Sequence, residues 1–105
     1  MKIVIEVLEI RLIADKRYVK AFADIRAGDF IITDFRIMQN LLDKHLYVRA
    51  PSVAYKDDAG QLKFKPILKV PDDQLWSEIV HAILTAYHQR EKEQGNEPTQ
   101  IPPTE

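Results

Sequence analysis

The sequence predicts an α+β fold, in which an antiparallel sheet of four to five strands is followed by one C-terminal amphipathic helix. Short runs of alternating apolar and polar residues fill the first half of the chain, separated by polar turns, which is typical of a strand meander. From Leu75 to Tyr87 the apolar residues recur instead at helical spacing. The 105 residues include no cysteine, which excludes a disulfide framework.

Three strands are expected in the first 38 residues, at 2–13, 18–25 and 30–38. In the early part of the first strand, apolar side chains occupy odd and even positions alike. A strand with one face in water alternates cleanly between apolar and polar residues, so this pattern predicts that both faces are covered. Turns at 15–17 and 26–29 would pair these strands as an antiparallel meander. Alternation places two sets of side chains on one face each: Val19, Ala21, Ala23 and Ile25 in the second strand, and Ile31, Thr33, Phe35 and Ile37 in the third.

The middle of the chain predicts less regular structure. A short fourth strand is expected at 46–50, and residues 51–60 are expected to form a long polar loop that begins at Pro51. A fifth strand at 62–70 is interrupted by Pro66, which favours an edge strand or an irregular extended arm.

The helix follows Asp72 and Asp73, which would cap its first turn, and Gly95 is a natural stop. Residues 1–94 therefore form the expected single domain. Residues 95–105 contain three prolines and few apolar side chains, which predicts a disordered tail. One helix covers only part of one sheet face, whereas the first and third strands also carry apolar residues on the opposite face. A second copy of the chain is the simplest way to bury them, so we expect a homodimer.

The formal net charge of −1 argues against a protein that coats nucleic acid along its whole surface. The charges are unevenly distributed, however: residues 44–70 carry six basic and two acidic side chains, whereas residues 71–105 carry two basic and seven acidic ones. No apolar run approaches the length of a membrane span, and the N-terminus lacks the pattern of a signal peptide. We expect a cytoplasmic protein without a membrane partner.

The sequence predicts no catalytic site, no metal site and no cofactor. His81 and His88 are seven residues apart on the predicted helix, but the second carboxylate–histidine motif that a di-metal site needs is missing. The remaining candidates for acid–base chemistry are strand carboxylates and arginines, for which cross-strand ion pairs are the favoured interpretation. These residues are Asp24, Asp34, Arg26 and Arg36.

The basic region combines cations with aromatic residues, Tyr55 and Phe64. Lysine and arginine can neutralise phosphates, and aromatic rings can stack on unpaired bases, so the pattern is compatible with nucleic-acid binding. Lysines that keep an edge strand from aggregating are an equally good explanation. The candidate nucleic-acid-binding residues here are Arg49, Lys56, Lys63, Lys65 and Lys69.

The order of three segments resembles the SpoVG family, the stage V sporulation protein G or septation regulators. These segments are DFIITDFRIM at 29–38, LYVRAPS at 46–52 and AILTAYHQ at 82–89. The likeness extends from about Ile5 to Gln89. Val53 follows the Pro-Ser pair at a position where the family usually carries a basic residue.

The resemblance implies a small homodimeric α+β domain, and a cytoplasmic bacterial regulator that binds nucleic acid and influences gene expression and septation or sporulation programmes. In that family the end of the terminal helix is implicated in DNA contact, and the matching positions are His88, Arg90 and Lys92. We therefore expect weak to moderate binding of DNA or RNA by the basic region and this helix end. The alternative is an adaptor that binds a protein partner, through its extended arm and acidic tail, and does not contact nucleic acid.

Overall fold

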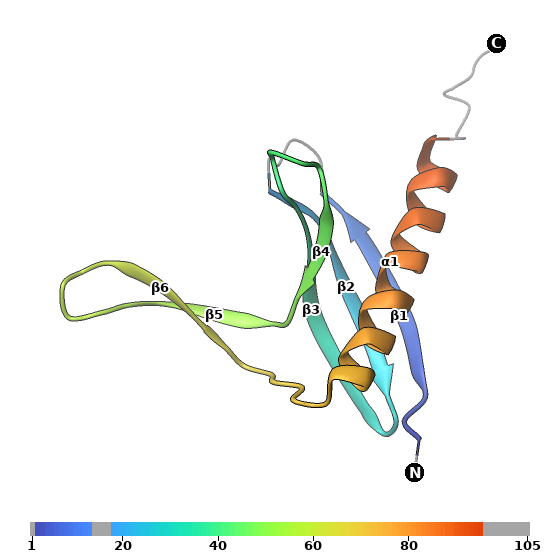
Figure 1. The fold of residues 1–105 in the computed structure, drawn as a ribbon, viewed down its shortest axis with the longest axis horizontal. Helices are drawn as coiled ribbons and strands as arrows, with labels where there is room; N and C mark the ends of the chain where they lie inside the picture. Colours follow the sequence, from blue (N-terminus) through green and yellow to red (C-terminus); the bar gives the residue numbers. More distant parts are fainter. Residues whose placement is uncertain (1, 14–17, 96–105) are drawn as a thin grey trace.

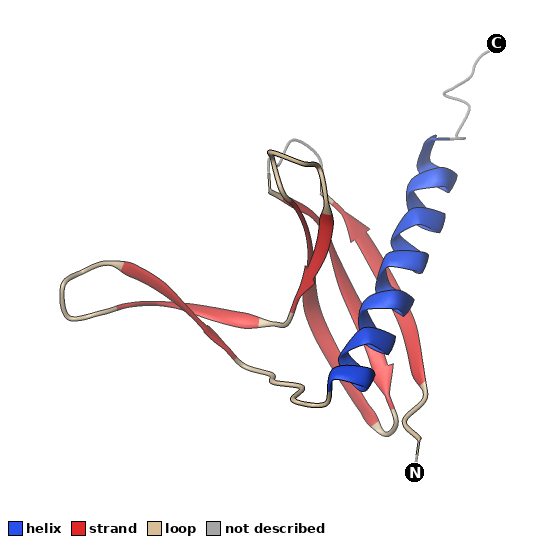
Figure 2. Cartoon of the chain, in the orientation of Figure 1, coloured by secondary structure: helices blue, strands red, loops and turns tan. Residues whose placement is uncertain are grey.

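The computed structural model describes residues 2–13 and 18–95. It confirms the α+β class, with an antiparallel meander followed by one C-terminal helix (Figures 1 and 2). The predicted turn at 15–17 and nearly all of the predicted tail lie outside the described residues. The elements are β1 (Ile5–Leu12), β2 (Val19–Ala27), β3 (Phe30–Gln39), β4 (Leu46–Arg49), β5 (Ser52–Lys56), β6 (Leu62–Pro66) and α1 (Asp73–Gly95).

The strands form two sheets. β1 to β4 make an antiparallel sheet in chain order, while β5 and β6 pair only with each other. The expectation of a polar loop at 51–60 was therefore wrong, because its first half is a strand of a β-hairpin that projects from the domain (Figure 1). The predicted fifth strand ends at Pro66 rather than at residue 70, since proline has no amide hydrogen with which to continue the ladder.

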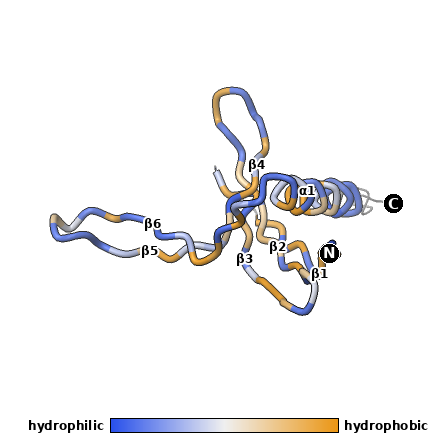
Figure 3. The backbone as a smooth tube through the Cα atoms, turned by 60° about the horizontal axis from the view of Figure 1, so that its bottom comes forward, coloured by the Kyte–Doolittle hydropathy of each residue, from blue (hydrophilic) through white to orange (hydrophobic). Residues whose placement is uncertain are grey.

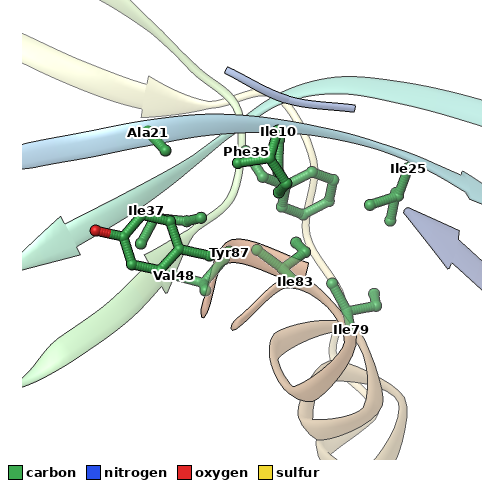
Figure 4. Close-up of a cluster of buried hydrophobic side chains, with 10 residues drawn as sticks. Ile10, Ala21, Ile25, Phe35, Ile37, Val48, Ile79, Ile83 and Tyr87 are labelled. Carbon is green, nitrogen blue, oxygen red and sulfur yellow. The ribbon is translucent and has the colours of Figure 1, made fainter. Parts of the chain in front are cut away.

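The helix α1 begins and packs as its sequence predicts. Asp72 caps it by accepting hydrogen bonds from the backbone amides of Gln74 and Leu75, at 2.9 and 3.1 Å. One helical stripe, Ile79, Ile83 and Tyr87, is buried against the sheet (Figure 4). The buried core combines this stripe with residues from all four strands of the main sheet: Ile10, Ala21, Ala23, Ile25, Phe35, Ile37 and Val48.

Two β-bulges, one in β1 and one in β3, change which side chains face the helix from what the sequence predicts. In β1 the extra residue is Leu8, so Val7 and Ile10 both pack toward the helix although they have opposite parity. In β3 the extra residue lies at 33–34, so that Ile32 packs against the core and Ile31 is exposed. The mixed parity of β1 therefore reflects a change of register and not cover on both faces.

A third register shift affects the start of β2. Val19 pairs with Met38, whereas Ala21 pairs with Ile37, so Lys20 is the extra residue. Ala21, Ala23 and Ile25 share one face as predicted and are fully buried there, but Val19 is not among the residues of the core or those packed against it.

Asp24 of β2 lies between the bulges of the two neighbouring strands. Its Oδ2 accepts a hydrogen bond from the Arg11 guanidinium at 2.6 Å, and its Oδ1 accepts one from the backbone amide of Asp34 at 3.1 Å. Arg11 also donates to the carboxylate of Asp34 at 2.7 Å. Asp34 has a φ of 69°, a left-handed conformation that aspartate tolerates better than most residues. This network lies on the sheet face opposite α1.

We predict that Asp24→Asn lowers the free energy of unfolding at pH 7 by about 1.5–3 kcal/mol, the usual range for hydrogen bonds to charged groups. The Asp24 side chain is only 16% exposed. The hydrogen bonds from Arg11 lower the pKa of Asp24, so its contribution is complete above the unfolded pKa of about 3.9 and is lost as the pH falls through the lower folded value. Urea unfolding at pH 7 and at pH 2–3 measures both effects.

The matched control is Glu6→Gln, which removes a carboxylate from an exposed pair with Arg26, 3.5 Å apart. This change should alter stability by no more than about 0.5 kcal/mol at either pH. Equal losses in the two variants would contradict a special role for Asp24.

Candidate nucleic-acid interface

One face of the four-stranded sheet is left open by α1. The helix packs over the face that carries the buried core, and the hairpin projects from the side opposite the helix (Figures 1 and 3). Because side chains alternate along strands, the residues between the core positions point to this open face. We refer to this surface as the open face. It includes Phe22 of β2, Arg36 and Met38 of β3, and Tyr47 and Arg49 of β4.

The hairpin of β5 and β6 is closed by an ordered turn. Asp57 accepts hydrogen bonds at Oδ1 from the amides of Ala59 and Gln61, both at 2.9 Å, and Gly60 has a φ of 80°. At the base of the hairpin, the Ile67 amide donates to the Pro51 carbonyl at 2.8 Å. These bonds explain why a segment of loop-like composition forms a defined arm.

The register of the hairpin sorts its side chains onto two faces. Val53 pairs with Lys65 and Tyr55 with Lys63, which places both lysines on one face. Phe64 and Leu62 lie on the other, as the alternation in the sequence predicts. Lys63 is within 3.5 Å of Asp57, so its charge is partly neutralised inside the hairpin.

The structure divides the eight predicted site residues into two groups. Arg49, Lys56, Lys63 and Lys65 lie along β4 and the hairpin, and Lys69 follows in the connection to α1. His88, Arg90 and Lys92 lie near the other end of α1, remote from the hairpin in Figure 1. In the second group, His88 is 3.9 Å from Glu91. The first group therefore lies along β4, the hairpin and the connection to α1, but Lys56 pairs with Leu62 and is on the hairpin face opposite Lys63 and Lys65.

Sequence reasoning named Arg36 as a candidate for a cross-strand ion pair and not as a nucleic-acid-binding residue. Cross-strand ion pairs were expected among Asp24, Asp34, Arg26 and Arg36, but the two aspartates bind Arg11 and Arg26 pairs with Glu6. In the described residues, 2–13 and 18–95, no carboxylate lies within ion-pair distance of Arg36. The pairing depends on the bulges of β1 and β3, which the sequence pattern does not reveal.

Arg36 connects the open face to the hairpin. Its guanidinium donates a hydrogen bond to the Ser52 hydroxyl at 3.4 Å and lies 5.9 Å from the centroid of the Phe64 ring, a cation–π distance. Across the ladder between β3 and β4, its direct partner is Arg49. Tyr47, two residues before Arg49, is on the same face of β4 and is 38% exposed.

No model of a protein family matches this sequence, and no curated protein matches it. The resemblance to the SpoVG family therefore depends on the three sequence segments and stays a prediction. Within the described part of the chain, no helix has the length and apolar character needed to cross a bilayer.

Proposed function

We propose that this protein is a homodimeric, non-enzymatic regulator of the SpoVG type that binds DNA or RNA. The observation that carries the proposal is the arrangement of cations on and beside the projecting hairpin. Lys56, Lys65 and Arg49 have no carboxylate within ion-pair distance in the described ranges 2–13 and 18–95, and exposed aromatic residues accompany them. Cations that are not neutralised within the protein remain available for phosphate groups.

The helix end supports the proposal less strongly. Arg90 and Lys92 alternate there with Glu91 and Glu93, so the local field nearly cancels. The hairpin and β4 are therefore the proposed principal interface, and the helix end is a second surface that can be tested separately.

We predict that the double variant Lys56→Gln/Lys65→Gln weakens binding to a mixed-sequence oligonucleotide by about tenfold at 50 mM salt, because it removes cations that displace counterions. Gel shifts on DNA and RNA over a salt series give the affinity and its salt dependence. The variant should also show a shallower slope of log affinity against log salt.

The matched control is Arg90→Gln/Lys92→Gln, which changes the net charge by the same amount at the helix end. We expect a loss of affinity of no more than about threefold, since those cations already neighbour carboxylates. A larger effect of the control than of the hairpin variant would move the interface to the helix. No shift of the folded wild-type protein at low salt would contradict the proposed function.

The homodimer is supported by apolar side chains that remain exposed. A two-stranded hairpin is marginally stable by itself in water, yet this one exposes apolar residues on both of its faces. Phe30 and Ile31 of β3 are also exposed. Burial against a second copy would cover such surface at low cost in chain entropy. The exposed apolar residues of the hairpin are Val53, Tyr55, Leu62 and Phe64.

We predict a mass in light scattering of twice the 12.2 kDa of one chain. The variant Val53→Thr/Leu62→Thr should shift the equilibrium toward monomer, because it removes buried apolar area while keeping β-propensity. Leu42→Thr is the control, since Leu42 is 95% exposed in the turn between β3 and β4. A wild-type protein that is monomeric at all concentrations would refute the dimer.

A protein-binding adaptor is the second candidate, favoured by an unpaired strand edge. β4 pairs only with the last four residues of β3, from Arg36 to Gln39, so the described structure leaves the edge from Phe30 to Phe35 without a strand. A groove beside this edge is lined by apolar residues, among them Ile31, Ile32, Pro51, Ile67 and Leu68. An extended apolar segment of another protein could add a strand there.

This adaptor function predicts partners that survive nuclease treatment in a pull-down and disappear with Ile67→Lys. Ile67 is 71% exposed, so the lysine should enter the groove without cost to the core. Leu42→Lys, which adds the same charge far from the groove, should retain those partners. Loss of every partner after nuclease treatment would instead favour the nucleic-acid function.

A further inference from the structure

Two arginines face each other across the β3–β4 ladder without a counterion. Arg36 and Arg49 are direct cross-strand partners, and residues in such positions have Cβ atoms about 4.5–5.5 Å apart. Like charges directly opposite each other destabilise a sheet. In the part of the chain that the structure describes, neither guanidinium has a carboxylate within 4 Å. The arrangement is unfavourable in isolation and becomes favourable when an anion binds between the two side chains.

The surroundings of the pair suggest which anion it binds. Guanidinium groups form bidentate hydrogen bonds with phosphate, and two of them can hold one phosphate from two sides. Arg36 is held in place by the Ser52 hydroxyl and by the Phe64 ring. Tyr47 and Phe64, 38% and 49% exposed, flank the pair. An isolated phosphate would not use these rings, whereas a nucleotide would place its base on one of them.

The same surroundings distinguish a single strand from a duplex. In a duplex the bases are stacked inside and unavailable to aromatic side chains, so Tyr47 and Phe64 would contribute nothing. In a single strand the bases can be splayed out and stacked on such rings while arginines hold the backbone. The open face is broad and rests on four strands, which keeps the arginines and the tyrosine in fixed positions.

We propose that Arg36 and Arg49 form a phosphate clamp for a single-stranded polynucleotide, whose bases stack on Tyr47 and Phe64. This inference rests on the proposed nucleic-acid function and specifies its substrate as a single strand. RNA and DNA share the chemistry that the clamp recognises, so the sugar is left to the experiment.

Fluorescence anisotropy with labelled 15-nucleotide oligo-U and oligo-dT, and with a 15-base-pair DNA duplex, tests the clamp. We expect the wild-type protein to bind one or both single strands at least about tenfold more tightly than the duplex, because stacking adds to the phosphate contacts. Arg36→Gln and Arg49→Gln should each weaken single-strand binding about tenfold, and Tyr47→Leu should weaken it without changing duplex binding. Loss of one phosphate contact should reduce the salt slope by about 0.7.

Arg26→Gln is the matched control, because it removes an arginine that is already paired with Glu6. We expect it to change single-strand affinity less than about threefold. The clamp also predicts that Arg49→Gln has an unchanged or higher melting temperature in sodium chloride, since a repulsion is removed. A fall of several degrees would show that Arg49 has a structural role and would overturn the clamp.

The outcomes separate the clamp from the function on which it rests. Equal affinity for duplex and single strands, or full affinity in the Arg36→Gln/Arg49→Gln protein, would overturn the clamp and leave nucleic-acid binding intact. No binding of any oligonucleotide by the folded wild-type protein would refute both. A preference for oligo-U over oligo-dT would assign the site to RNA, and the reverse would assign it to single-stranded DNA.

Discussion

The register of the sheet depends on the ion-pair network around Asp24. The Asp24 carboxylate of the inner strand β2 accepts hydrogen bonds from Arg11 of β1 and from the backbone amide of Asp34 in the β3 bulge, and Arg11 also binds the Asp34 carboxylate. Each bulge inserts one residue, which changes the face that the following side chains occupy. Without these insertions, Ile10 or Val7 would face away from α1, and Ile32 could not join Phe35 in the core. A polar network on one face thereby determines how the apolar face is filled.

The same network determines what the open face presents. Arg36 follows the bulge of β3, so the insertion at 33–34 decides both its side of the sheet and its partner in β4. Since the aspartates are occupied by Arg11, Arg36 remains free to hold the hairpin through Ser52 and Phe64. Which arginines of the sheet are paired with carboxylates therefore determines which arginine is available for the proposed function.

The sequence predicted the elements better than their register. Helical spacing and Asp72 located α1, because a cap and a buried stripe are local patterns. The bulge of β1 did leave a signal, a change of parity, but it was interpreted as cover on both faces. The bulge of β3 was missed because the residues around the insertion still alternate. The hairpin could have been found: residues 52–56 alternate modestly, and Asp57 with Gly60 gives a turn pattern. The Arg36–Arg49 pair could not, because it follows from a register that long-range contacts determine.

The position of the arginine pair bears on a choice that the sequence left open. Lysines along β6 are explained equally well by phosphate binding and by protection of an exposed edge. Edge protection requires only charge on an outer strand, whereas Arg36 projects from the inner strand β3 onto the face of the sheet. Its charge there opposes that of Arg49 across the ladder, which is unfavourable in the isolated fold, although Arg36 also contacts Ser52 and Phe64 of the hairpin. The proposed phosphate clamp would account for this arrangement, and under that proposal phosphate contact is preferred to edge protection.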